Sequence, residues 1–400
     1  MLQGKTIVLG VAGSIAAYKI ANLASMLVKQ RATVHVIMTR NACNFITPTT
    51  FETLTGNKCL IDTFDRNFEF QVEHVSLAQK ADLFLIAPAT ANMIGKLAHG
   101  ICDDMLTTTV FATKAPKLVS PAMNTNMWEN PILQDNLATL KHYGYDIISP
   151  ASGRLACGAV GSGKMPSEEV LMSHILLHVG KEKDLQGKHI LVTAGPTQEA
   201  IDPVRYITNH SSGKMGYALA KMAVMRGASV TLVSGPVNIE PFIGIDVVNV
   251  KSAADMAEAV AARSEESDIV VMCSAVADYT PTHYSAQKVK KSDGELSIPL
   301  ARTTDILHTL GMKKKEGQML VGFSMETENL IENSRKKLSK KNADIICANT
   351  IADGGATGFA VDTNQVTLIT ETEVITLPLC TKEVTADLIL SHIVELQKEK

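Results

Sequence analysis

Short β-branched apolar runs alternate with amphipathic stretches along nearly the whole chain. The first run, TIVLGVAG (6–13), enters a glycine turn and is followed by an amphipathic stretch to about Gln30. A spacing of three to four residues between apolar positions indicates a helix, whereas the short β-branched runs indicate strands. Further strands are predicted at 33–39, 82–90 and 117–123. This strand–helix alternation predicts a parallel sheet with helices on both faces.

A charged stretch, VGKEKDLQGKHI (179–190), interrupts this pattern. The pattern of a strand followed by a glycine turn then starts again, because KHILVTAGPTQE (188–199) resembles KTIVLGVAGSIA (5–16). We therefore expect two different α/β domains in tandem, 1–183 and 184–400. The second is predicted to continue with strands at 229–236, 268–279, 318–326 and 344–350.

The last part of the second domain has a different pattern of apolar and polar residues. Residues 358–379, which include FAVDTNQVTLITETEVITLPL, predict two strands around a turn. We expect an antiparallel hairpin that closes the edge of the sheet and has a structural purpose only.

Composition narrows the class of protein. The 400 residues exceed one ordinary core, and 46% of them are hydrophobic with a formal charge of −3, which favours neither nucleic acid nor a membrane surface. No run approaches about 18 apolar residues, and the N-terminus indicates a strand, a turn and a helix rather than a signal peptide. The seven cysteines form no C-x-x-C pair, which argues against structural zinc and a disulfide framework. We expect a cytoplasmic protein.

The first glycine turn is a candidate phosphate site. GVAGSIAAYK (10–19) follows a strand and opens a helix, where backbone N–H groups and the helix dipole favour an anion. It lacks the dinucleotide spacing G-x-G-x-x-G, and the second strand ends in Thr39 and Arg40 rather than in a ribose-binding carboxylate. Both features weigh against NAD. The hydroxyls of Ser14 and Thr39 suit a monophosphate such as that of FMN, and a purely structural turn is the alternative.

Other stretches of the first domain have both functional and structural interpretations. APATANMIGKLAHGICDD (87–104) follows a strand, where open α/β sheets bind ligands. His74 is predicted just before a helix, either as a base or as a surface residue. Asn124 and Asn126 are predicted in a loop, either at a site or as turn and cap residues. CGAVGSGKM (157–165) is either a degenerate phosphate loop with Met165 in place of the hydroxyl, or a mobile glycine-rich segment that carries a thiol.

Together these stretches resemble a known family. GSIAAYK, MTRNACNFITP (38–48), HVSLA, PATANMIGK, PAMNTNMW and GRLACGAVGSGKMP (153–166) are similar to the flavodoxin-like, FMN-dependent cysteine decarboxylases, above all those that act on phosphopantothenoylcysteine. The resemblance covers residues 5 to about 175. It implies that FMN oxidises the cysteine thiol of the substrate and thereby creates an electron acceptor for decarboxylation.

The resemblance also implies roles for single residues. The CGAVGSGKM segment becomes a flap over the substrate, in which Gly158, Gly161 and Gly163 provide flexibility, and Cys157 becomes the proton donor. His74 is the implied acid/base beside the flavin, and Asn124 binds the departing carboxylate. The residues assigned to FMN are Gly13, Ser14, Thr39, Asn92 and Met123.

In the second domain, SSGKMG (211–216) offers an anion cradle with Lys214 at a helix N-terminus. Asp278 ends a buried strand, where a carboxylate is suited to hold Mg²⁺ near phosphates. Lys288, Lys290 and Lys291 form a cluster that is more often a solvated face than a site.

GPTQEAIDPVRYITNHSSGKMG, AVADY, QKVKK, VGFSMET (321–327) and ICAN (346–349) resemble the phosphopantothenate–cysteine ligases from about 187 to 395. The resemblance implies that phosphopantothenate reacts with CTP to give an acyl-cytidylate, from which cysteine displaces CMP. Asn209 and Lys288 are then catalytic. The residues assigned to CTP are Met272, Cys273, Ser274, Asp278, Lys288, Thr304, Asp305, Ile306, Leu307, Phe323, Lys337 and Lys341.

The chain as a whole is thus expected to be a flavodoxin-like (HFCD flavoprotein) domain followed by a Rossmann-like ligase domain with a C-terminal hairpin. Its small molecules are FMN, Mg²⁺, CTP, 4′-phosphopantothenate and cysteine, without nucleic acid or membrane. The resemblance implies a homo-oligomer of trimeric decarboxylase and dimeric ligase units, which a dodecamer would combine. Two other interpretations are disfavoured. A flavin-binding regulatory subunit without decarboxylase activity does not fit because His74, Asn124 and Cys157 are all present, and an NAD(P)-dependent reductase does not fit because the glycine spacing and the ribose carboxylate are missing.

Overall fold

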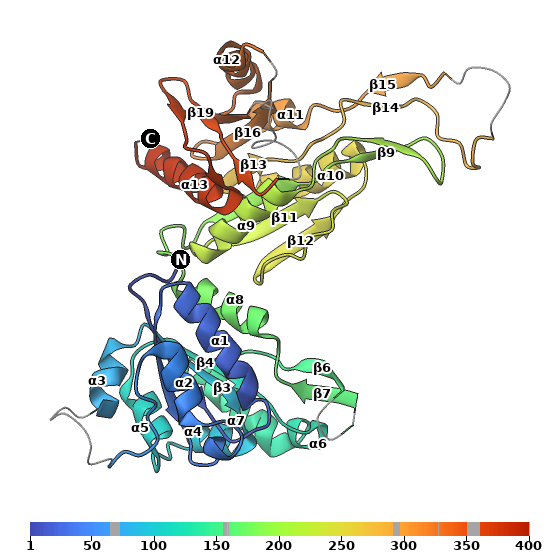
Figure 1. Cartoon of the computed structure of the whole chain (residues 1–400). Helices are drawn as coiled ribbons and strands as arrows, with labels where there is room; N and C mark the ends of the chain where they lie inside the picture. The colour runs from blue at the N-terminus through green and yellow to red at the C-terminus, as the bar shows by residue number, and fades with distance from the viewer. Residues whose placement is uncertain are drawn as a thin grey trace. The chain divides into compact units, whose positions relative to one another are not determined.

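The computed structural model describes residues 1–64, 73–154, 158, 160–290, 297–326, 328–349 and 361–399. The chain divides into two compact units, Met1–Lys181 and Glu182–Lys400, and each has its own sheet (Figure 1). Among the described helices, none combines the length and the apolar character that crossing a membrane requires.

The first unit is built on a five-stranded parallel sheet. Its strand order is β2-β1-β3-β4-β5, which is the flavodoxin-like order and confirms the predicted fold class. The strands are β1 (Thr6–Val11), β2 (Thr33–Met38), β3 (Leu83–Ala89), β4 (Lys117–Pro121) and β5 (Asp146–Ile147). The helices are α1 (Ala17–Lys29), the 3-10 turn η1 (Ala42–Asn44), α2 (Pro48–Thr55), α3 (Glu73–Lys80), α4 (Ala91–Ala98), α5 (Met105–Ala112), α6 (Thr125–Trp128), α7 (Pro131–His142) and α8 (Glu168–Val179).

The central strand β3 is buried at every position because helices cover both faces of the sheet. On one face, Phe84 and Ile86 of β3 belong to the same core cluster as Met93 of α4, Val110 of α5 and Leu137 of α7. A separate antiparallel hairpin, β6 (Ala151–Arg154) and β7 (Val160–Lys164), follows the last strand of the sheet.

The second unit is built on an eight-stranded sheet with the order β12-β11-β8-β13-β16-β17-β19-β20. Its first six strands are parallel in the Rossmann order, and β19 and β20 form the predicted antiparallel hairpin at the edge. The sheet strands are β8 (His189–Ala194), β11 (Ser229–Ser234), β12 (Ile245–Asn249), β13 (Ile269–Met272), β16 (Met319–Met325), β17 (Ile345–Asn349), β19 (Thr367–Ile369) and β20 (Val374–Thr376). The helices are α9 (Lys214–Met225), α10 (Ala253–Ser264), α11 (Ile306–Lys313), α12 (Leu330–Lys341) and α13 (Lys382–Glu399).

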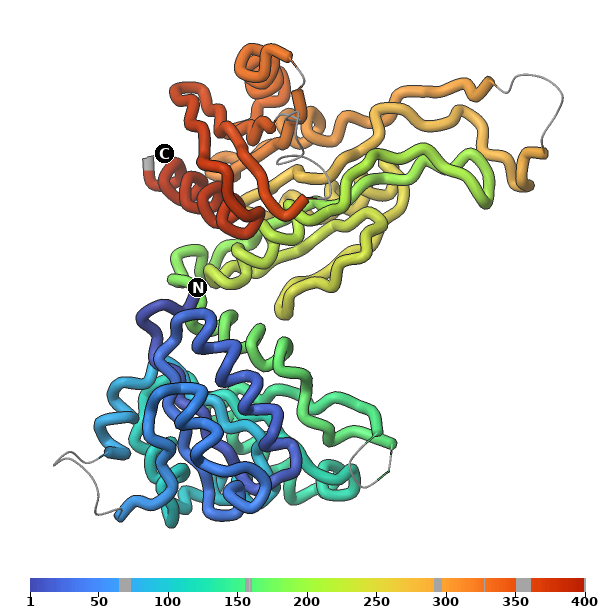
Figure 2. Tube along the Cα trace, in the orientation of Figure 1, coloured from blue at the N-terminus to red at the C-terminus, as the bar shows by residue number. Residues whose placement is uncertain are grey.

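Three short antiparallel pairs lie outside this sheet. They are β9 (Gln198–Ala200) with β10 (Tyr206–Thr208), β14 (Tyr279–Pro281) with β15 (Leu300–Arg302), and β18 (Thr363–Asn364) with β21 (Cys380–Thr381). In the chain trace, the first two pairs appear as long extended segments (Figure 2). The strand expected at 268–279 was therefore too long, since β13 ends at Met272 and the chain leaves the sheet there.

Arg226, at the end of α9, ties three segments of the second unit together. Its guanidinium donates two hydrogen bonds to the Asp184 carboxylate, Nε to Oδ1 at 2.8 Å and Nη2 to Oδ2 at 2.5 Å. Its Nη1 donates to the Asp387 carbonyl and to Ser391 Oγ of α13, both at 3.0 Å. The Arg226 side chain is buried, and its hydrogen bond to Asp184 lowers the pKa of that carboxyl.

Replacement of Arg226 by Met should destabilise the second unit by about 1.5–3 kcal/mol at pH 7, because the partly exposed Asp184 carboxylate loses its hydrogen bonds to a charged partner. Since folding lowers the pKa of Asp184, this contribution is present at neutral pH. It is lost as the pH falls below the carboxyl's unfolded pKa of about 3.9 towards its folded value. Urea unfolding at pH 7 and near pH 3 measures both effects. Arg263→Met serves as the control, because the Arg263 side chain, among the described groups, bonds only to the Ala259 carbonyl of its own helix. Equal losses in the two variants would contradict the prediction.

Candidate active sites

In the first unit, the assigned flavin residues follow four neighbouring parallel strands. Gly13 and Ser14 follow β1, Thr39 follows β2, Asn92 follows β3 and Met123 follows β4. The carboxyl ends of parallel strands meet at one edge of a sheet, so these residues gather there. The strand order reverses between β1 and β3, and ligands bind outside such a switch point in open α/β sheets.

The loops after β1 and β2 form a close-fitting polar cradle. Ser14 Oγ accepts a hydrogen bond from the Ala16 N–H at 3.3 Å, and Thr39 Oγ1 accepts one from the Ala42 N–H at 3.2 Å. A Cβ atom on Gly13 would lie 2.6 Å from Cβ of Asn41, so the two loops approach as closely as glycine permits. The N-cap of α1 has no side-chain hydrogen bond and its first turn has no acidic residue. This donor set fits a phosphate monoester.

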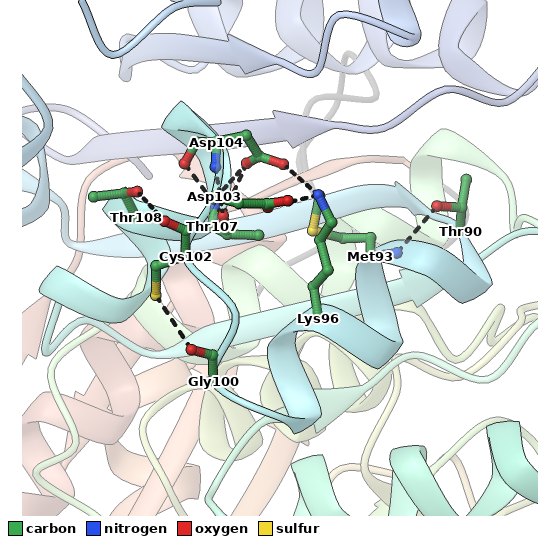
Figure 3. Close-up of polar contacts among 9 residues, drawn as sticks. All are labelled: Thr90, Met93, Lys96, Gly100, Cys102, Asp103, Asp104, Thr107 and Thr108. Atoms are coloured by element: carbon green, nitrogen blue, oxygen red, sulfur yellow. Dashed lines mark hydrogen bonds and ion pairs between the residues drawn. The ribbon is translucent and has the colours of Figure 1, made fainter.

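Hydrogen bonds fix the segment after β3, in which Asn92 is exposed on the first turn of α4. Thr90 caps α4 through the Met93 N–H, and Asp104 forms a capping box with Thr107 at the start of α5 (Figure 3). Lys96 Nζ donates to Asp103 at 2.6 Å and to Asp104 at 3.1 Å, which joins the two helices. The polar residues of this stretch therefore position the loop at the sheet edge.

Two expectations about local structure were wrong. His74 lies within the first turn of α3, half-buried, rather than before the helix. Asn126 lies inside the short helix α6 rather than in a loop, and Asn124 is the N-cap of that helix, with Oδ1 accepting from the Asn126 N–H at 2.8 Å. The sequence TNMW is too short for periodicity to reveal a helix. The capping interpretation of Asn124 is thus correct, and its role towards a carboxylate stays a prediction.

The β6–β7 hairpin is docked on the loop after β4. The Met123 N–H donates to the Gly163 carbonyl at 3.0 Å, and Thr125 Oγ1 donates to the Ser162 carbonyl at 2.9 Å. Since Val160–Lys164 is a strand and not a loop that feeds a helix, the phosphate-loop interpretation is wrong. Cys157 belongs to the connection between the two strands and lies outside the described residues.

Gly163 allows the hairpin backbone to approach the loop after β4 closely. Its φ is +119°, and a Cβ atom there would lie 2.4 Å from the Met123 carbonyl oxygen. Gly161 has the same function, because a Cβ would lie 2.6 Å from Thr125 Oγ1. The sequence suggested flexibility as the reason for these glycines, whereas the structure gives a steric one.

Gly163→Ala should therefore loosen the hairpin from the loop after β4. Relieving the clash costs about 1–3 kcal/mol, so hydrogen exchange at the Met123 amide should become at least about fivefold faster. Gly158→Ala is the control, because Gly158 also has a positive φ of +87° but no described atom lies within 4 Å of the Cβ site. Unchanged protection of Met123 in the first variant would contradict the docking.

In the second unit, a cavity of about 1010 Å³ opens at the carboxyl edge of the sheet. It collects every residue assigned to the ligase site except one: Asn209, Met272, Cys273, Ser274, Asp278, Thr304, Asp305, Ile306, Leu307, Phe323, Lys337 and Lys341. Lys288 is the exception and is exposed in the segment after β14. That segment is held by Asp202, whose Oδ2 accepts from the Val289 N–H at 3.1 Å and from Arg205 Nη2 at 2.6 Å.

A threonine that sequence reasoning missed organises one wall of the cavity. Thr193, fully buried at the end of β8, accepts the N–H groups of Cys273 and Ser274 at 3.0 and 3.1 Å and donates to Ser274 Oγ at 2.9 Å. Asn209 Nδ2 donates to the Ala275 carbonyl at 3.1 Å. Burial raises the pKa of Cys273 to about 12, so this thiol stays protonated at neutral pH.

The cavity carries an excess of positive charge. Its described lining includes five cationic side chains, Lys214, Arg302, Lys337, Lys341 and Lys382, against the carboxylates of Asp278 and Asp305. Lys337 and Lys341 lie on one face of α12, as their spacing predicts, and pair with Glu326 (2.6 Å) and Asp305. Arg302 and Lys382 were not predicted, because neither lies in a recognisable motif. A large cavity with this charge fits a ligand that bears several anionic groups.

Comparison with known proteins agrees with this division into two α/β halves. Residues 1–180 match the family model described as "Flavoprotein", and residues 185–396 match "DNA/pantothenate metabolism flavoprotein C-terminal domain". The coenzyme A biosynthesis bifunctional protein CoaBC of Bacillus subtilis is 48% identical over 92% of this chain and 91% of its own length. A "Cysteine/Cysteine sulfinic acid decarboxylase" of an unknown prokaryotic organism is 45% identical over 86% of this chain and 98% of its own. The crystal structure of the C-terminal domain of a CoaBC protein has 46% identity over 55% of this chain and all of its own, with a TM-score of 0.47.

The fold and the matched models therefore define a flavoprotein domain joined to a pantothenate-metabolism domain. The chain belongs to the family of the coenzyme A biosynthesis bifunctional proteins.

Proposed function

We propose that the chain makes 4′-phosphopantetheine in two reactions, one in each unit. The second unit joins 4′-phosphopantothenate to cysteine at the expense of CTP, and the first unit decarboxylates the product with the help of FMN. The observation that carries this proposal is the tandem match of two family models, each over one structural unit, together with full-length relatives that are named for coenzyme A biosynthesis.

The ligation needs a carboxylate to become an electrophile. A carboxylate oxygen of phosphopantothenate bonds to the α-phosphorus of CTP, and the bond to the β-phosphate breaks, so that pyrophosphate leaves with the electron pair. The cysteine amine then bonds to the acyl carbon and loses a proton while CMP leaves. Anions must meet at each stage, and Lys337 and Lys341 offset their repulsion.

Asn209 lies at the cavity wall where its amide can orient the acyl group, and Asp278 is the carboxylate offered to Mg²⁺. Within the described residues, no three His, Cys, Asp or Glu side chains are arranged to hold a metal ion. Mg²⁺ would thus take most of its oxygen ligands from the nucleotide and from water, as it commonly does at phosphate sites.

The first unit would carry out the decarboxylation at the carboxyl edge of its sheet. Bound FMN supplies the two-electron oxidation of the substrate thiol and later returns those electrons. The Ser14 and Thr39 loops would hold its phosphate, and Asn92 and Met123 would contribute to the rest of its pocket. In this proposal His74 acts as acid and base, Asn124 orients the substrate carboxylate, and Cys157, which lies outside the described residues, protonates the product.

The two reactions should separate by mutation. Cys157→Ser or His74→Asn should abolish CO₂ release and leave amide formation intact, so that phosphopantothenoylcysteine accumulates. Mass spectrometry of an incubation with phosphopantothenate, cysteine, Mg²⁺ and CTP or ATP detects both products. Absence of the amide and of its decarboxylated product in the wild-type incubation would defeat the proposed function.

Lys341→Gln should have the opposite effect. Loss of a charge-assisted contact to phosphate costs about 1.5–3 kcal/mol and should lower kcat/KM for CTP by roughly 10–100-fold, with decarboxylation of supplied phosphopantothenoylcysteine unchanged. Lys340→Gln on the same helix is the matched control, because Lys340 is exposed and does not line the cavity. Equal kinetics of the two variants would contradict the proposed contact between Lys341 and the nucleotide.

A second candidate substrate follows from the relative named for cysteine and cysteine sulfinic acid. Decarboxylation of free cysteine would release CO₂ without CTP or phosphopantothenate. Incubation of the protein with cysteine alone distinguishes this activity from the two-step reaction.

A further inference from the structure

Lys382, the first residue of α13, lies far along the chain from every other lysine of the ligase cavity, yet it lines that cavity. Antiparallel pairing of β18 with β21 brings it there, by placing Thr363 opposite Thr381. The Lys382 N–H donates to the Asp362 carbonyl at 2.9 Å, and Nζ donates to the Val361 carbonyl at 2.5 Å. α13 packs along α9, whose N-terminus borders the same cavity (Figure 1).

Lys382 is unusual because its charged side chain is buried. The residue is 7% exposed, and an ammonium buried to this extent is costly unless anions surround it. Burial, and after it the charge of Lys214, lowers the pKa of Lys382, whereas Asp362 raises it. Asp362 is itself turned to solvent, with 86% of its side chain exposed, and pairs with Lys214 at 2.6 Å.

The α12 side of the cavity differs in this respect. There Lys337 and Lys341 each have a carboxylate partner, Glu326 and Asp305. At the α9 side, the ammonium groups of Lys214 and Lys382 lie around the solvent-exposed carboxylate of Asp362. Both lysines also line the cavity there.

Other groups at this side also suit an anion. The first turn of α9 places its N–H groups at the cavity, with Gly213 in a left-handed conformation at the N-cap. Asn364 is 2% exposed, lines the cavity, and its Nδ2 donates to the Met215 sulfur at 3.9 Å, a weak acceptor. Lysine ammonium, amide and backbone N–H groups together form a typical phosphate-binding set.

We propose that Lys382, assisted by Lys214, binds the β- and γ-phosphates of the nucleotide and stabilises the pyrophosphate that leaves when the acyl-cytidylate forms. This rests on the proposed ligase function. The bridging oxygen between the α- and β-phosphorus atoms takes up the electron pair of the breaking bond, and the Lys382 ammonium neutralises the charge that develops there.

The position of Lys382 favours the nucleotide over the 4′-phosphate of phosphopantothenate. Lys382 and Cys273 line the same cavity, and the charge of Lys382 lowers the pKa of that thiol against the larger effect of burial. Cys273 belongs to the segment 272–274, which is assigned to CTP. Lys382 is a positioning and charge-stabilising residue in this scheme, because no chemical bond forms on it.

The experiment compares ligands that share or lack the two terminal phosphates. In Lys382→Met, the KM for CTP and the inhibition constant of inorganic pyrophosphate, both with Mg²⁺, should rise at least tenfold. Inhibition by CMP and the KM for 4′-phosphopantothenate should stay within twofold of wild type. Lys382→Arg should recover most of the lost pyrophosphate affinity, and Lys398→Gln, an exposed lysine near the far end of α13, should behave as wild type.

Thermal unfolding provides a readout that a purely structural role would not give. Without ligand, Lys382→Met should unfold at the wild-type temperature or above it, because a buried charge has been removed. The stabilisation that pyrophosphate and Mg²⁺ give the wild-type protein should be lost in the variant. If Lys382→Met fails to fold, Lys214→Gln must show the same selective loss.

Unchanged pyrophosphate affinity in these variants would overturn the inference. So would an equal loss for CMP, or a loss confined to 4′-phosphopantothenate, since either places the lysine at another group. A wild-type protein that binds pyrophosphate through Lys382 but forms no amide would support the subsite and refute the proposed function.

Discussion

In a parallel sheet every strand ends at the same edge, and this constraint determines where both halves of the chain carry their chemistry. The first unit has the order 2-1-3-4-5 and the second has 3-2-1-4-5-6 before its antiparallel hairpin. Each order reverses beside its first strand, so the loops on either side of that point diverge and leave room for a ligand. Residues from separate motifs meet there although dozens of positions separate them in the sequence.

The two units use this edge in different ways. The first supplies a neutral cradle of hydroxyls and backbone N–H groups at Ser14 and Thr39, together with a hairpin docked through Met123 and Thr125. The second supplies a cavity in which cations outnumber carboxylates among the described lining residues. The proposed function accounts for this difference, because a monophosphate cofactor held for many turnovers needs fixed geometry, whereas a triphosphate that loses pyrophosphate needs charge that stabilises the departing group.

Small residues have a steric function in the first site. Gly13 permits the loops after β1 and β2 to meet, and Gly163 permits the hairpin to contact the Met123 carbonyl. In the second site the corresponding function belongs to Thr193, which gathers the N–H groups of Cys273 and Ser274 where the chain leaves the sheet. Neither arrangement involves a charged group, yet both fix the positions of residues assigned to the chemistry.

Local sequence determined the fold class and most of the sheet strands, because buried parallel strands such as β3 are continuous apolar runs whose period and boundaries are visible in the chain. It also determined the motifs that the structure gathers in the ligase cavity. Short elements such as β5 and α6 have too few residues for a period to show. The places of Arg302, Asn364 and Lys382 were decided only by tertiary structure, since the pairing of β18 with β21 and the packing of α13 on α9 are long-range contacts. A lysine at the start of a helix carries no local signal that it will be buried beside a cavity, because its burial depends on the pairing with β18 and on α9, which lies more than a hundred residues away.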